Sequence, residues 1–345
     1  MTLITGFIYK NTVQIIADSA ETMECQIEDS ILIPNDRETS FGEIAQNKDY
    51  TITESAQKIY VIEDKMILTF AGDVREGEAV VEDIRTLHST FANITDFLTV
   101  YFRQNIFAET QYIIGYYEND TAKLCYCYEN GDFAIKEGER AMALAGMDAN
   151  RISQAVTSSY HWVFNNNVFS TDNALAYIIA TIQWYSTTFT TINRGVGGFF
   201  NGCYISSEGI SWSKDTLYLL YSLDNYDKGD KHTIIKYNRG NSVFVISRHL
   251  KKVFMPTNES YTEILNNYGT ELEDSIANQK AEYYIMLAYD HPTLTAINKS
   301  MPHGDKIRTE NGKITIEDPI LKWMFNYGKT PNGEPVFVSS TNFDK

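Results

Sequence analysis

Apolar, β-branched positions predict a β-hairpin at the start of the chain. Residues 2–9 and 12–18 form two such runs, and Lys10 and Asn11 separate them as a short polar turn. A second hairpin is predicted over residues 58–62 and 66–71. The chain therefore opens with paired strands.

Helical periodicity begins after the second hairpin. Val80, Ile84, Leu87 and Phe91 fall at helical spacing, which predicts an amphipathic helix. The same patterns predict further helices over residues 96–107, 148–162 and 170–185, and strands over residues 111–117, 122–128, 133–136, 202–206 and 209–213.

This order of strand pairs, two helices, strands, two helices and strands predicts an α+β protein. Two sheets can then stack face to face with helices on their outer faces, as a four-layer αββα sandwich. We assign it to residues 1–225, with a long polar insertion at about residues 19–57 that lacks a sustained period. Residues 226–345 form a C-terminal extension of unknown fold, with strands over 233–237 and 242–247 and helices over 261–268 and 274–289.

Composition and charge limit the partners and cofactors that we expect for the protein. The 345 residues carry 29 basic and 45 acidic side chains, a net charge of -16, which argues against nucleic acid as a partner. No leader-like start and no long apolar window occur, so we expect a cytoplasmic protein with no membrane partner. Four separated cysteines and six scattered histidines predict reduced thiols and neither a metal nor a cofactor.

Thr2 is the first candidate for chemistry. It follows the initiator methionine, so removal of Met1 would expose a threonine with a free α-amine. That amine has a reference pKa of about 7.7–8.0 and lies within reach of its own hydroxyl, so nucleophile and base come in one residue. Threonine at this position is also common without any such role, so further residues must support the interpretation.

Three further residues occur along the chain in the order that such a site requires. Asp18 ends the second strand of the first hairpin and so folds back towards Thr2, while Lys58 opens the next strand and can reach the same corner. A lysine cation beside the amine would favour its neutral form. Gly72 follows a strand, where its backbone N–H can stabilise an oxyanion. Each residue also has an interpretation without chemistry: Asp18 as an acid in a turn, Lys58 as an exposed lysine and Gly72 as the glycine before a helix.

These residues resemble the proteasome β-subunit and its bacterial two-ring peptidase relative. The resemblance lies in Thr2 to Gly6 (TLITG), the strand ending in Ile-Ile-Ala-Asp-Ser and residues 58–72 (KIYVIEDKMILTFAG), with Asp18 sixteen residues after Thr2 and Gly72 fourteen after Lys58. It implies an N-terminal-nucleophile (Ntn) hydrolase fold with Thr2, Asp18, Lys58 and Gly72 as site residues. It also implies a peptide or protein substrate and a homo-oligomeric ring with residues 80–91 and 148–162 as candidate contact surfaces, and it leaves an unfoldase partner open.

Two features depart from the family pattern. The segment from Ser19 to Gln57 is longer than the corresponding loop by about two dozen residues. Asn193 and Val196 stand where active members carry an aspartate and a serine, and residues 141–146 (AMALAG) lack a serine found in the related turn.

Three hypotheses therefore remain from sequence: a threonine peptidase that cleaves amide bonds through an acyl-enzyme on Thr2, a catalytically inactive structural or binding subunit, and an amidase for a small molecule.

Overall fold

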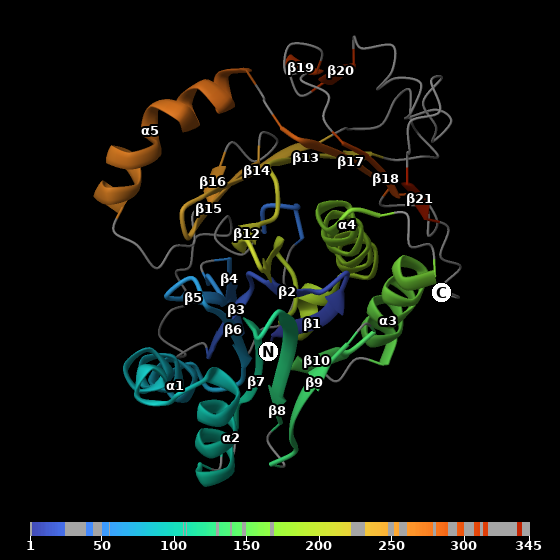
Figure 1. The fold of residues 1–345 in the computed structure, drawn as a ribbon. Coiled ribbons are helices and arrows are strands. Elements are labelled where there is room, and N and C mark those ends of the chain that lie inside the picture. Colours follow the sequence, from blue (N-terminus) through green and yellow to red (C-terminus); the bar gives the residue numbers. More distant parts are fainter. Residues whose placement is uncertain are drawn as a thin grey trace.

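Two five-stranded antiparallel sheets form the N-terminal part of the chain (Figure 1). The computed structural model describes residues 2–24, 39–43, 50–54, 56–105, 107, 109–128, 131–138, 140–146, 150–165, 169–221, 232–247, 252–254, 261–278, 281–288, 295–299, 307–310, 313–316 and 337–339. In spatial order, the first sheet contains β10 (Met142–Gly146), β1 (Leu3–Tyr9), β2 (Thr12–Asp18), β11 (Phe200–Ser206) and β12 (Gly209–Trp212). The second contains β5 (Ile59–Ile62), β6 (Met66–Ala71), β7 (Gln111–Glu118), β8 (Thr121–Cys127) and β9 (Phe133–Glu137).

The two sheets pack against each other through an apolar cluster. Ile4 and Ile15 of the first sheet belong to the same buried cluster as Ile67, Ile113 and Leu124 of the second. Tight turns build the hairpins, because pairs of left-handed residues suit the twist of the flanking strands. Such pairs occur at residues 10–11, 63–64 and 119–120, as the sequence predicts for each turn.

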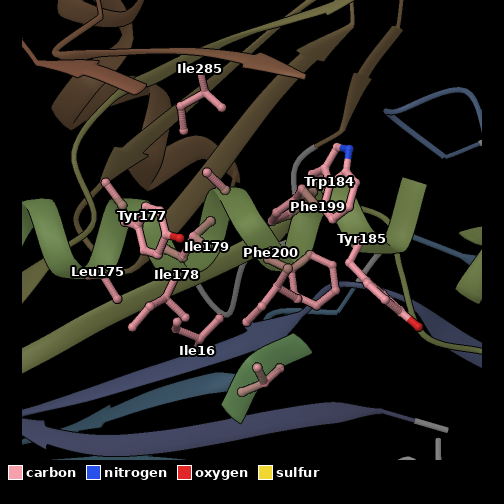
Figure 2. Packing of buried hydrophobic residues seen from close by; sticks show 14 of the residues in the cluster. Ile16, Leu175, Tyr177, Ile178, Ile179, Trp184, Tyr185, Phe199, Phe200 and Ile285 are labelled. Atoms are coloured by element: carbon pink, nitrogen blue, oxygen red, sulfur yellow. The ribbon is translucent and has the colours of Figure 1, made fainter. Parts of the chain in front are cut away.

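Helices cover the outer faces of both sheets. Val80 of α1 (Val74–Leu87) and Leu98 of α2 (Ile94–Gln104) are buried in one cluster with Leu68 of the second sheet. Leu175 of α4 (Thr171–Phe189) is buried in another with Ile16 of the first sheet, as Figure 2 shows. The helix α3 (Asn150–Asn165) packs beside α4.

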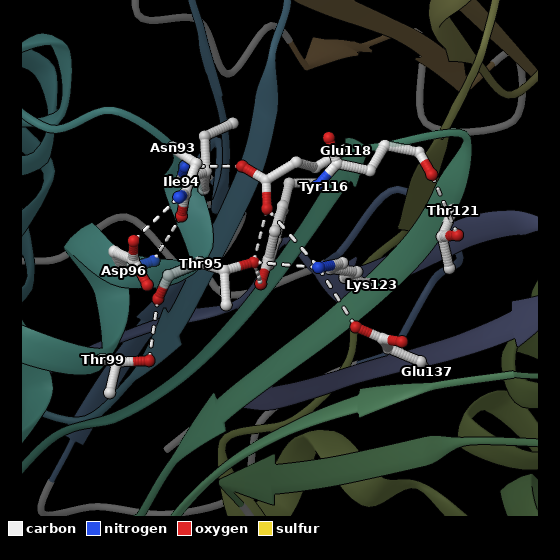
Figure 3. A network of polar contacts seen from close by, with 11 residues as sticks. Asn93, Ile94, Thr95, Asp96, Thr99, Tyr116, Glu118, Thr121, Lys123 and Glu137 are labelled. Carbon is white, nitrogen blue, oxygen red and sulfur yellow. Dashed lines mark hydrogen bonds and ion pairs between the residues drawn. The ribbon is translucent and has the colours of Figure 1, made fainter.

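Glu118 fixes α2 on the second sheet through polar contacts (Figure 3). It accepts hydrogen bonds from the Ile94 N–H at 2.6 Å and the Thr95 hydroxyl at 2.5 Å, and Lys123 of β8 lies 3.4 Å away. Burial would raise the pKa of Glu118, but these hydrogen bonds and the lysine lower it. The ionised carboxylate thus holds the first turn of α2, where negative charge is favourable.

A seven-stranded sheet lies on the far side of α4 (Figure 1). Its strands in spatial order are β16 (Lys252–Phe254), β15 (Ser242–Ser247), β14 (His232–Arg239), β13 (Thr216–Tyr221), β17 (Tyr283–Ala288), β18 (Thr295–Lys299) and β21 (Phe337–Ser339). Ile234 and Ile285 belong to the same cluster as α4, which explains why every α4 residue from Ala174 to Ser186 is buried. The strands flanking the predicted domain boundary at residue 225, β13 and β14, pair in this one sheet. The boundary stays a prediction.

The structure corrects one prediction and adds two hairpins. Residues 274–289 do not form one helix: α5 (Tyr261–Asn278) is continuous across residues 269–273, and β17 follows it. The run Tyr283–Ala288 is apolar at nearly every position and pairs with β13 in parallel, and a strand buried on both faces carries no alternation that distinguishes it from a helix. The polar insertion also contains paired strands, β3 (Glu21–Glu24) and β4 (Tyr50–Thr53). A further hairpin of β19 (Ile307–Glu310) and β20 (Lys313–Ile316) lies near the C-terminus.

Candidate active site

Thr2, Asp18 and Lys58 meet at one end of the first hairpin. The antiparallel register pairs Ile4 with Ala17, which places Asp18 beside the start of β1. The Lys58 ammonium, at the start of β5 in the other sheet, donates to Thr2 Oγ1 at 3.1 Å and to Asp18 Oδ1 at 2.8 Å. It also donates to the Ala20 carbonyl. Both sheets therefore contribute to a single cluster of a hydroxyl, an ammonium and a carboxylate.

Asp18 is buried, and both of its carboxylate oxygens accept hydrogen bonds. Its side chain is 0% exposed and that of Lys58 is 11% exposed. Oδ1 also accepts the Leu3 N–H at 3.1 Å, and Oδ2 accepts the Gly197 N–H at 3.1 Å. A buried ion pair is tolerated when further hydrogen bonds satisfy both groups, and here they do. The arrangement holds the lysine ammonium against the Thr2 hydroxyl.

Gly72 follows β6 and lies on the same pocket wall as Thr2. Its φ is +140°, and a Cβ there would lie 2.0 Å from the Glu109 carbonyl oxygen. Only glycine therefore fits this backbone. Gly146 approaches from β10: its φ is +95°, and a Cβ would lie 2.0 Å from the Thr2 carbonyl oxygen. Glycine at position 146 therefore lets the end of β10 lie against the Thr2 backbone, whereas glycine at position 72 lets the chain after β6 lie against the Glu109 backbone.

A pocket of about 240 Å³ opens beside Thr2. Its wall includes Lys58 and Gly72, the carboxylates of Glu21 and Glu78, and the aromatic rings of Tyr60 and Phe70. The two rings stack with centroids 5.6 Å apart. Burial, together with the negative charge of Glu78, raises the pKa of Tyr60 to about 12, so its hydroxyl stays neutral. A substrate side chain placed here would meet one stacked aromatic wall and two acidic groups.

The loop that contains Asn193 and Val196 approaches the site through its backbone. Val196 is fully buried, and its carbonyl accepts a hydrogen bond from the Thr191 hydroxyl at 2.9 Å. The contact with Asp18 comes from the backbone N–H of the next residue, Gly197. Neither residue can supply the acid or hydroxyl found in active members of the resembled family.

Two glutamates that the sequence analysis did not identify lie behind this loop. Glu43 and Glu54 are both buried and come from described parts of the insertion. Burial raises the pKa of Glu43 to about 8 and that of Glu54 to about 7; for Glu43 the neighbouring charge of Glu54 adds to the rise, while hydrogen bonds oppose it for both. No periodic pattern marks two single glutamates in a polar segment, so only the three-dimensional structure identifies them.

Metal ligands, membrane-spanning helices and thiols were also sought in the described part of the chain. There, no group of three or more potential metal-ligating side chains is found, and no helix is both long and apolar enough to cross a membrane. Cys125, Cys127 and Cys203 are buried free thiols, and burial raises the pKa of each. Cys25 lies outside the described residues.

Comparisons with known proteins give a likeness to solved structures but no match in sequence. No protein-family model matches the sequence, and no curated protein matches it either. Among solved structures, the chain is similar to eukaryotic HslV from Trypanosoma brucei, with a TM-score of 0.40 and 12% identity over 59% of this chain and 98% of that chain. At this score and identity the likeness adds nothing to the chemistry, which depends on the contacts described above.

Proposed function

We propose that the protein is a threonine-type Ntn hydrolase that cleaves amide bonds through an acyl-enzyme on Thr2. The observation that carries the proposal is the Lys58 ammonium, which contacts Thr2 Oγ1 and Asp18 Oδ1 at the edge of a pocket. A buried carboxylate, a cation and a hydroxyl in this order serve to orient and activate a nucleophile. The motif resemblance around Thr2, Asp18, Lys58 and Gly72 supports the same chemistry.

Removal of Met1 comes before catalysis and frees the α-amine of Thr2. The neutral amine takes the proton from Oγ1 as that oxygen attacks the carbonyl carbon of the substrate. The carbonyl electron pair moves to oxygen, and the Gly72 N–H stabilises the resulting oxyanion. Lys58 favours the neutral amine by its positive charge, and Asp18 holds Lys58 in place.

Collapse of the tetrahedral intermediate breaks the carbon–nitrogen bond. The departing amine takes the proton from the Thr2 ammonium, which leaves an ester on Oγ1 and a neutral α-amine. Water then attacks the ester and gives its proton to that amine. Breakage of the ester bond returns the proton to Oγ1 and restores the starting state.

We further propose that residues 1–225 form the αββα sandwich of an Ntn hydrolase and that this unit self-assembles into a ring. The two facing sheets and their outer helices support the layer order. The α1–α2 layer carries the exposed apolar residues Val74, Leu87, Phe91 and Val100, at 46%, 42%, 37% and 37% exposure. The other helical layer is partly covered by the chain's own seven-stranded sheet. We therefore favour the α1–α2 layer for contacts between copies.

An inactive structural subunit is the second candidate. Val196 favours it, because this buried apolar side chain replaces a hydroxyl expected in the proton network of active relatives. The contacts among Thr2, Lys58 and Asp18 oppose it, because an inert scaffold has no need of a buried ion pair aimed at the first threonine.

Intact mass of the purified protein tests the proposal. We expect loss of Met1 and a single adduct after incubation with an epoxyketone, which reacts with an N-terminal threonine. Thr2→Ala should lose the adduct, whereas Thr2→Ser should retain it because serine keeps a hydroxyl beside the amine. Retention of Met1, or a processed protein that no electrophile modifies at Thr2, would leave the inactive subunit as the correct description.

A further inference from the structure

Three consecutive backbone N–H groups each donate to the carboxyl group of a residue from a different part of the chain. The Gly197 N–H donates to Asp18 Oδ2 at 3.1 Å, the Gly198 N–H to Glu43 Oε2 at 3.3 Å, and the Phe199 N–H to Glu54 Oε1 at 2.6 Å. One short loop thereby connects the candidate active site to two side chains of the insertion.

Glu54 is held tightly in this arrangement. Its Oε1 also accepts from the Ser40 hydroxyl at 2.7 Å and the Ser19 hydroxyl at 3.2 Å, and its Oε2 accepts from the Ser40 N–H at 2.6 Å. Both carboxylate oxygens therefore face backbone N–H donors. Since a backbone N–H cannot reverse its role, the site requires an acceptor at each oxygen.

Glu43 is held more loosely. Its Oε2 accepts from the Thr39 hydroxyl at 3.2 Å as well as from Gly198, while its Oε1 lies 3.4 Å from the Ser186 hydroxyl. A hydroxyl can accept as well as donate, so an amide group at Oε1 would be tolerated. The two glutamates thus differ in how they should respond to replacement by glutamine.

The opposite side of the loop is fixed by α4. Gln183 donates to the Gly198 carbonyl at 2.7 Å and accepts the Phe200 N–H at 3.0 Å. The loop is therefore clamped between α4 and the insertion. The N–H of Gly197, at the start of the loop, donates to Asp18 Oδ2, while Asp18 Oδ1 accepts from the Leu3 N–H and the Lys58 ammonium.

We propose that Glu54 is a positioning residue for the Thr2 site, acting through the loop of residues 197–199 on Asp18 and through Asp18 on Lys58. This inference rests on the proposed hydrolase function. Displacement of the loop removes the Gly197 bond and lets the Asp18 carboxylate rotate, which moves the Lys58 ammonium relative to the Thr2 amine. The insertion would then take the supporting role that Asn193 and Val196 cannot perform.

The test compares wild type, Glu54→Gln and Glu43→Gln by the rate at which an epoxyketone modifies Thr2, followed by intact mass across pH 6–9. We expect Glu54→Gln to react at least about tenfold more slowly and to reach half its maximal rate at higher pH, because Lys58 no longer depresses the amine pKa fully. Glu43→Gln should stay within about twofold of wild type. Equal rates and pH profiles for all three proteins would overturn the inference and leave the hydrolase function standing. An unmodified wild type would overturn both.

A second variant keeps the test decisive if Glu54→Gln does not fold. Ser40→Ala removes one hydroxyl donor to Glu54 and leaves the carboxylate and the Ser40 N–H in place. We expect an intermediate reduction in the modification rate, with an unchanged circular dichroism spectrum. If Glu54→Gln does not fold and Ser40→Ala reacts like wild type at every pH, Glu54 has only a structural role.

Discussion

Replacement of Glu43 by glutamine should make the protein's stability less dependent on pH. Burial and the charge of Glu54 raise the pKa of Glu43 from 4.5 to about 8. In the folded state the side chain therefore keeps its proton at pH values where the unfolded chain has lost it. A native state that binds more protons than the unfolded state loses stability as pH rises. For this carboxyl group the loss runs from about pH 4.5 to its folded pKa.

The size of the effect follows from the shift. Each pH unit within that window costs about 1.4 kcal/mol of unfolding free energy, so wild type should lose roughly 3 kcal/mol relative to Glu43→Gln between pH 5 and pH 7. The glutamine has no proton to lose. It also preserves the acceptor for the Gly198 N–H.

Urea unfolding followed by circular dichroism at pH 5, 6 and 7 measures this difference. Glu208→Gln is the matched control, because Glu208 is exposed and its replacement should shift all three free energies alike. A constant difference between wild type and Glu43→Gln across the three pH values would refute the reasoning, because it would mean that Glu43 ionises in the folded protein as it does in the unfolded chain.

Three further perturbations address other parts of the molecule. Gly72→Ala should lower the free energy of unfolding by about 3 kcal/mol, because the added Cβ would collide with backbone atoms. Gly131→Ala is the control and should cost about 1 kcal/mol, because Gly131 has a positive φ but lies in open space, so equal losses in urea unfolding would contradict the collision. Glu78→Lys should lower kcat/KM for peptides with a basic residue before the scissile bond at least about tenfold, because it reverses one of the two negative charges of the pocket; an unchanged preference would place the substrate side chain elsewhere. Leu87→Glu should reduce the assembly mass measured by light scattering, because it puts a charge on the exposed α1 surface; an unaltered mass would exclude that surface.

The contacts around Thr2 could be anticipated because local structure determines them. A two-residue turn fixes the register of β1 and β2, and the register alone brings Asp18 beside the start of β1. Lys58 requires one further step, since it lies in the facing sheet, but its place at the start of a strand already limits where its ammonium can reach. For these residues, the local sequence pattern is enough to predict most of their relative positions.

The glutamates of the insertion could not be anticipated in this way. Glu54 is buried because Ser19, Ser40 and Phe199 supply its hydrogen bonds, and none of these partners is a sequence neighbour. A polar segment without a period gives no sign that single side chains within it are buried, and only the long-range contacts show it. The strand at residues 283–288 also escapes prediction from the local pattern, because its pairing with β13 joins segments that are distant in the sequence.

The insertion and the C-terminal extension act on the same short stretch of backbone. Glu43 and Glu54 hold the N–H groups of residues 198 and 199, while Lys236 of β14 donates to the Phe200 carbonyl at 3.5 Å and to Asn201 Oδ1 at 3.1 Å. Phe200 is also the ladder partner of Asp18. Both additions therefore reach the buried carboxylate of the candidate site through one strand end. Because that strand end pairs directly with Asp18, we expect deletion of either addition to disturb the Thr2 site, and neither can be treated as a separable appendage.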